Sequence, residues 1–261
     1  MVARAHSAFW RPRLRSSNSC GINNPLRPRH VFPTISFFLA LSGLVSAAQP
    51  VDEAALIRGV DVAVRARQDA IAAYTVAEHY SVFRNSDETH PAAEMTVKTS
   101  YRRETGKSYT ILSQSGSEIL RRLVLGAILE REKQINQPGV RESTFLTSAN
   151  YEMKLKPGGL QLIDGRNCLA LSINPRQKAP NMVVGTIWVD AYDQSLVQLQ
   201  GTASKSVSHF AGPTEMMRQY AKIDGFAMAT HARAASSSFL FGPTVVTIDY
   251  RDYQIQLREG R

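Results

Sequence analysis

Residues 185–201 read Gly-Thr-Ile-Trp-Val-Asp-Ala-Tyr-Asp-Gln-Ser-Leu-Val-Gln-Leu-Gln-Gly, and this stretch decides the fold. Two segments rich in aliphatic and β-branched residues flank the turn Tyr192-Asp193-Gln194. This arrangement predicts a pair of antiparallel strands at 184–190 and 196–202. The same alternation of strand segments and turns continues on both sides of it.

The rest of the chain adds further strands to this pair. Turns such as Pro157-Gly158-Gly159 and Asp224-Gly225 separate segments of strand composition. The expected strands are 74–83, 95–103, 109–113, 151–156, 160–163, 168–173, 216–223, 226–236 and 244–257. Short strands with regular turn signals predict a meandering antiparallel sheet in an α+β fold.

A first helix is expected at 52–71, ahead of all these strands. Acidic Asp52 and Glu53 suit its positive end, while Leu56, Val60 and Val64 recur every four residues along it. A weaker helix is expected at 142–150.

A second helix, at 115–135, is the most apolar segment after residue 48. Ser115 and Glu118 have the spacing of a capping box, and Pro138-Gly139 ends the helix. Leu125 and Leu129 widen its apolar face beyond one stripe. That face consists of Ile119, Leu120, Leu123, Val124, Ala127 and Ile128. Such a helix is either buried under a sheet or also lines a ligand cavity, and we expect Leu123 and Val124 to face that sheet or cavity.

The first 48 residues have the layout of a secretory leader. Six arginines precede the apolar run 35–45, which ends in Val45-Ser46-Ala47-Ala48. A basic region, a short apolar region and small residues predict export, with cleavage between Val45 and Gln49. The basic region is unusually long, which favours a translation start assigned too early. No later apolar run has transmembrane length.

Loss of this leader changes the charge of the chain. Its six arginines leave 25 basic against 22 acidic residues, so the net charge falls from +9 to +3. The basic character of the whole chain therefore does not indicate a nucleic-acid partner. Cys20 leaves as well, and Cys168, in a strand-like segment, is expected to be a small buried thiol.

Motifs of known chemistry are absent from the sequence. Gly106-Lys107-Ser108 ends like a phosphate-binding loop, but Tyr101 stands where that loop needs its first glycine. No nucleophile elbow occurs, and His79, His90, His209 and His231 lack the spacing of a helical zinc site. Missing motifs count against an enzyme without excluding one, because catalytic residues can assemble from distant positions. We expect no catalytic residue, metal or cofactor.

The order of these elements resembles the LolA/LolB/RseB superfamily of periplasmic outer-membrane lipoprotein-sorting proteins. The pair 185–190 and 196–201 is similar to a hairpin of that superfamily, and the closing strands 226–236 and 244–253 fit the same pattern. The resemblance covers 51–257 and implies a single domain over residues 49–261. Its fold would be an incomplete antiparallel barrel, a strongly curved sheet whose concave face helices cover.

The resemblance also implies an apolar cavity for acyl chains, which needs no catalytic motif. The candidate lining residues are Leu120, Leu123, Val124, Ala127, Ile128 and Trp188. The expected function is a non-catalytic periplasmic carrier of a lipid or lipoprotein in a Gram-negative bacterium, with an envelope protein as a further partner. The alternatives are an RseB-like envelope sensor of lipidated ligands and an envelope hydrolase.

Overall fold

The structure is a computed structural model, and it describes residues 51–179, 181–205, 212–238 and 242–259. The chain divides between Ala48 and Gln49 into two units, and everything below concerns the second one. The expected leader at 1–48 lies outside the described residues.

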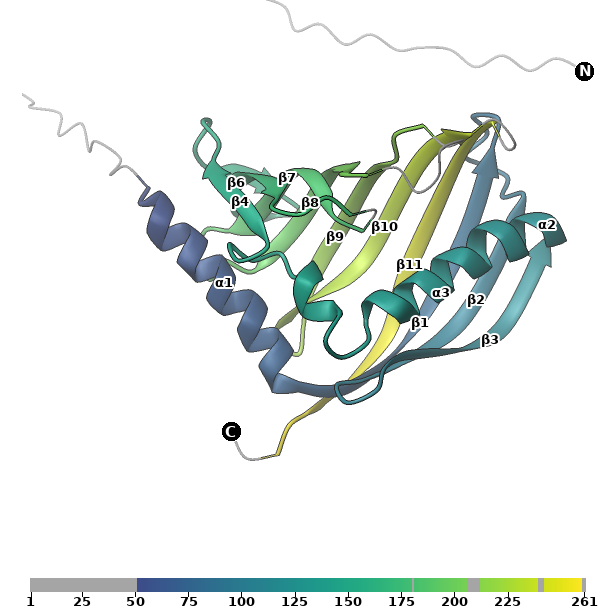
Figure 1. Cartoon of the computed structure of the whole chain (residues 1–261), viewed down its shortest axis with the longest axis horizontal. Helices are drawn as coiled ribbons and strands as arrows, with labels where there is room; N and C mark the ends of the chain where they lie inside the picture. The colour runs from purple at the N-terminus through teal and green to yellow at the C-terminus, as the bar shows by residue number, and fades with distance from the viewer. Residues whose placement is uncertain (1–50, 180, 206–211, 239–241, 260–261) are drawn as a thin grey trace, which may run out of the picture. The chain divides into compact units, whose positions relative to one another are not determined.

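The described residues form one antiparallel sheet of eleven strands (Figure 1). The strands are β1 (Ile71–Arg84), β2 (Ala93–Arg102), β3 (Gly106–Gly116), β4 (Tyr151–Leu155), β5 (Gln161–Ile163), β6 (Arg166–Pro175), β7 (Val183–Asp190), β8 (Leu196–Ala203), β9 (Glu215–Ile223), β10 (Phe226–Ser238) and β11 (Gly242–Leu257). Every strand expected from the sequence is present. Most are longer than expected by a few residues.

The spatial order of the strands is β3-β2-β1-β11-β10-β9-β8-β7-β6-β4, with β5 also paired to β6. Most neighbours are consecutive in the chain, as in a meander. The important exception is the pairing of β1 with β11, the first and last strands in the described part of the chain, which places Glu78 opposite Tyr250. The strands β3 and β4 end the order without pairing to each other, so the sheet is not closed into a barrel.

The first helix, α1 (Glu53–Ala70), begins and ends close to the expected residues. The carboxylate of Asp52 caps it by accepting a hydrogen bond of 3.1 Å from the Ala55 amide. Leu56 and Val60 are buried, and they pack with residues of β4, β6 and β7 such as Ile187. Burial of this apolar stripe, rather than helix propensity, holds α1 on its half of the sheet.

The second helix has three parts: α2 (Glu118–Leu120), the π-helical turn η1 (Arg121–Gly126) and α3 (Ala127–Ile135). Ser117 caps it, accepting a hydrogen bond from the Leu120 amide. The expected capping role of Ser115 is wrong, because Ser115 belongs to β3 and donates to Glu94 instead.

The π-helical turn changes which side of this helix faces the sheet. A π-helix hydrogen-bonds at i→i+5 and so inserts one extra residue into the turn. Leu120, Leu125 and Leu129 consequently share the buried face and pack against Tyr80, Val82 and Met95 of the sheet. Leu123 is 51% exposed, so the expectation that it faces the sheet or the cavity is wrong. Val124 does pack against this core.

The helices lie on the same face of the sheet, which curves around them (Figure 1). A one-turn 3-10 helix, η2 (Arg141–Thr144), stands where a longer helix was expected at 142–150. The expected fold class, an α+β fold with an open antiparallel sheet and helices against it, is confirmed.

Candidate ligand cavity

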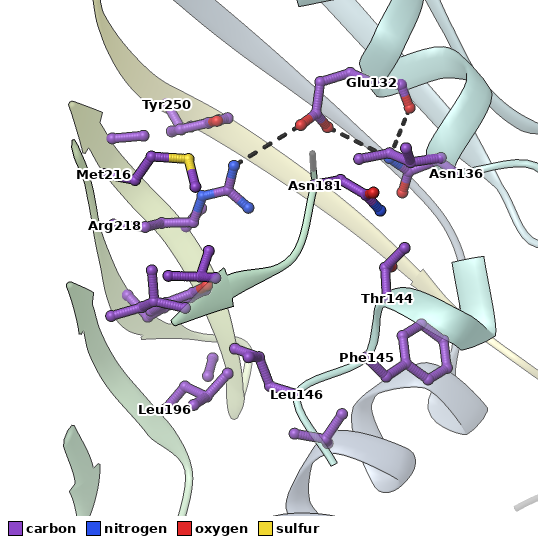
Figure 2. Close-up of a pocket in the computed structure, with 18 of the residues that line it drawn as sticks. Glu132, Asn136, Thr144, Phe145, Leu146, Asn181, Leu196, Met216, Arg218 and Tyr250 are labelled. Carbon is purple, nitrogen blue, oxygen red and sulfur yellow. Dashed lines mark hydrogen bonds and ion pairs between the residues drawn. The ribbon is translucent and has the colours of Figure 1, made fainter. Parts of the chain in front are cut away.

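A cavity of about 610 Å³ lies where α1, α3, the segment 144–146 and the sheet face one another. Figure 2 shows Phe145, Leu146, Leu196 and Met216 around it. Much of its wall is apolar and comes from both helices and from strands on both halves of the sheet, including Val64, Ile128, Phe145, Leu196, Met216 and Ile248. The cavity therefore lies between the two cores that α1 and α3 each form with the sheet.

Charged side chains occupy one part of the same wall. Lys107 Nζ, at the start of β3, lies 2.9 Å from Glu132 Oε2 on α3, and Arg218 of β9 lies 3.8 Å from Glu132 Oε1. Asn136 donates from its side-chain amide to the Glu132 carbonyl oxygen at 2.8 Å and to Oε2 at 3.3 Å. Figure 2 shows Glu132 between Asn136 on one side and Arg218, which lies beside Met216, on the other.

The electrostatics of this group are those of a mutually stabilised ion pair. Burial by itself would raise the pKa of Glu132, but the positive charges of Lys107 and Arg218 and the hydrogen bonds it accepts lower that pKa to about 2. Burial by itself would lower the pKa of Lys107. The negative charge of Glu132 is the main effect that opposes burial, and the pKa of Lys107 is raised. Both groups are therefore charged at neutral pH.

A second acidic residue, Glu78 of β1, lines the cavity and is 2% exposed. Its Oε2 accepts a hydrogen bond of 2.5 Å from the Tyr80 hydroxyl. Within the described residues, Oε1 has no hydrogen-bond partner. Burial, followed by the nearby Glu78 charge, raises the pKa of Tyr80, and burial raises that of Tyr250. Both phenols are consequently neutral donors.

Arginine and aromatic side chains connect the segment after α3 to the sheet. Arg141 donates to the Tyr101 hydroxyl at 3.0 Å and to the Arg103 carbonyl oxygen at 2.6 Å, and its guanidinium lies 5.8 Å from the centre of the Tyr101 ring. Tyr101 in turn stacks on Tyr74 at 4.9 Å. These contacts hold the segment that carries Phe145 over the cavity.

Of the six candidate lining residues, the structure places only Ile128 at the cavity wall. Leu120 is buried in the core beneath the helix, and Val124 packs against that core. Leu123 and Ala127 are exposed. Trp188 of β7 donates its indole N–H to Gln161 at 2.8 Å and is not among the lining residues.

The polar residues of the cavity were missed at the sequence level, although one of them left a signal there. Tyr74, Val76, Tyr80 and Val82 alternate along β1 and are buried, and Glu78 occupies the same inward register. A single acidic residue in a buried apolar alternation indicates a site. Lys107, Glu132 and Arg218 gave no such signal, because their strands and helix carry charges on exposed positions as well.

Cys168 is fully buried, as expected, and burial raises the pKa of its thiol. The described residues contain no group of three or more His, Cys, Asp and Glu side chains suited to a metal ion. No helix within them is long and apolar enough to cross a membrane.

Comparison with known proteins finds similarity at the level of solved structures. No family model and no curated protein matches the chain. A LolA superfamily protein from Nitrosomonas europaea is 12% identical over 79% of this chain and 94% of that one, with a TM-score of 0.43. An outer membrane lipoprotein-sorting protein domain from Vibrio parahaemolyticus is 14% identical over 78% and 95%, with a TM-score of 0.43.

A DUF1329 family protein from Desulfovibrio piger also matches, at 14% identity over 77% of this chain and 93% of that chain, with a TM-score of 0.40. The superfamily that the sequence resembles is thus among the matched structures. At these identities and TM-scores the similarity assigns neither a ligand nor a partner to this chain.

Proposed function

We propose that this protein is a non-catalytic carrier that holds an acyl chain of a lipid or lipoprotein in the cavity under α1 and α3. The observation that supports this most is the cavity itself, about 610 Å³ with apolar walls from both helices and the sheet. Its volume falls within the range of about 300–1,000 Å³ that is usual for pockets that hold small molecules.

Burial of methylene groups supplies the binding free energy in this proposal. Each buried CH₂ contributes about 0.8 kcal/mol, so a chain of ten methylenes gains several kcal/mol before the cost of ordering it. An apolar wall such as that formed by Val64, Ile128 and Met216 is sufficient for this, and no reactive group is required.

The proposed place of action is the periplasm, to which the expected leader would deliver the protein. The proposed partners there are acyl chains and an envelope protein that supplies or accepts the lipidated ligand. The periplasmic location is supported by the expected leader alone, since the cavity is compatible with any compartment.

Binding of a fluorescent fatty acid to the exported protein tests the proposal. We expect saturable binding, recovery of the fatty acid unchanged, and an affinity that rises with chain length more than it changes with headgroup. Non-saturable binding would contradict the carrier function. Covalent change of an acylated substrate would instead favour a hydrolase.

Two variants of one helix locate the binding site. Ile128→Trp places a large ring at the cavity wall and should lower the affinity for the fatty acid at least several-fold by filling the space. Leu123→Trp makes the same chemical change on the exposed side of the helix and should leave the affinity unchanged. Equal effects of the two variants would place the ligand elsewhere.

A further inference from the structure

Among the described residues of the cavity wall, Glu78 has a buried side-chain oxygen without a hydrogen-bond partner. It is 2% exposed, and its Oε2 is bound by the Tyr80 hydroxyl at 2.5 Å. Among the described residues no donor lies within hydrogen-bond distance of its Oε1, although the residue lines the cavity. A buried carboxylate oxygen without a donor is costly, so a molecule in the cavity that donates to it gains free energy from that contact.

The charges nearby indicate which kind of donor fits. The Glu132 carboxylate is already paired with Lys107 and Arg218, and the cavity lining as a whole contains more basic than acidic side chains, with Arg67 and Arg131 among the basic ones. A cationic ligand would add an uncompensated charge to a partly dry space. A neutral hydroxyl or amide N–H donates to Oε1 without adding to that positive charge.

We infer that Glu78 is a specificity-determining residue that accepts a hydrogen bond from a neutral hydroxyl or amide N–H of the bound acyl molecule. The inference rests on the proposed function and adds to it the class of ligand. An acyl chain with such a donor packs against the apolar wall and also donates a hydrogen bond to Glu78 Oε1. An acyl chain without a donor packs against the same wall but leaves Glu78 Oε1 without a hydrogen bond.

Pairs of probes in which a methyl group replaces the donated hydrogen test this directly, and the added methyl by itself favours the member without the donor. Dodecanol is compared with dodecyl methyl ether, and N-dodecylacetamide with its N-methyl derivative, each by displacement of the fluorescent fatty acid from the exported protein. We expect the donor-bearing member to bind about ten-fold more tightly, since leaving a buried acceptor unpaired typically costs about that much. The pair that shows the larger preference distinguishes a hydroxyl from an amide.

The variant Glu78→Leu combined with Tyr80→Phe removes both polar groups at once. Replacement of both partners by apolar groups of similar shape preserves packing, which circular dichroism and thermal unfolding check. We expect this variant to bind both members of each pair equally, with the affinity for the ether retained. The matched control Glu152→Gln, a surface residue of β4 outside the cavity lining, should keep the full preference.

The outcomes separate the inference from the function on which it rests. Equal affinity of the wild-type protein for the two members of both pairs, or a preference that survives in the Glu78→Leu/Tyr80→Phe variant, would overturn the role of Glu78 alone. Failure of the fatty acid itself to bind would overturn the carrier function, and the inference with it.

Discussion

Lys107 at the start of β3 and Glu132 on α3 form an ion pair of 2.9 Å, with side chains only 14% and 23% exposed. The pair connects the helix that covers the cavity to the first strand in the order of the sheet. Arg218 approaches the same carboxylate from β9, across the cavity. One acidic residue thus holds three separate elements around the candidate site.

Removal of one partner of this pair should destabilise the protein. We expect Lys107→Met to lower the free energy of unfolding by up to about 3 kcal/mol, because it leaves the Glu132 carboxylate with only the longer Arg218 contact of 3.8 Å and the Asn136 hydrogen bond. The double variant Lys107→Met/Glu132→Leu should recover part of that loss, since it removes the paired charges of both residues and leaves only Arg218, whose side chain is 39% exposed, without its carboxylate partner. Urea unfolding measures both, and an additive double variant would show that the two residues are not coupled.

Acid should weaken the protein through Glu132. Its pKa is about 2 in the folded state and lies below the unfolded value, so the stabilisation is present above the unfolded pKa, near 4.5, and is lost as the pH falls toward 2. The contribution is at most about 3 kcal/mol for a shift of this size. Between pH 6 and pH 2, the free energy of unfolding should fall more steeply for the wild-type protein than for Glu132→Gln. An equal fall for the two proteins would contradict a lowered pKa of Glu132.

The π-helical turn predicts opposite results for two leucines two residues apart. Leu125 is fully buried, and Leu125→Ala should cost about 2–5 kcal/mol through the cavity it leaves. Leu123 is 51% exposed, and Leu123→Asp should change the free energy of unfolding by no more than about 0.5 kcal/mol. A regular α-helix would turn Leu123 toward the sheet, so a large loss for Leu123→Asp would contradict the π-helical turn.

Export predicts a defined start for the mature protein. The apolar run 35–45 followed by small residues should be removed by cleavage between Val45 and Gln49. Sequencing of the N-terminus of the periplasmic protein measures this. Detection of the intact 35–45 segment on that protein would contradict the secretory interpretation.

Local patterns were sufficient to predict most elements of the fold. The alternation and turns of residues 185–201 correctly indicated β7 and β8, and Asp52 with Leu56 and Val60 correctly indicated α1. These signals succeed because a hairpin or a capped amphipathic helix is specified by residues close together in the chain. The open antiparallel sheet follows from them.

The apolar helix shows where such patterns stop being sufficient. The expected face at Leu120, Leu123 and Ala127 assumes the α-helical period throughout, and the turn at Arg121–Gly126 adds a residue. The shifted face packs against Tyr80 of β1 and Met95 of β2. Those strands are distant from the helix in the sequence, so local patterns do not reveal this packing. The choice between burial and ligand lining was therefore open in the sequence.

By itself, the sequence determined the elements and the class of the fold, because helix and strand periods are local properties. The cavity was decided only by tertiary structure. Glu78, Lys107, Glu132 and Arg218 come from β1, β3, α3 and β9, and they line one cavity because β1 pairs with β11 and α3 crosses the sheet. Charge pairing across a cavity depends on distance in space, and residues 86 positions apart, such as Glu132 and Arg218, carry no local pattern that would reveal it.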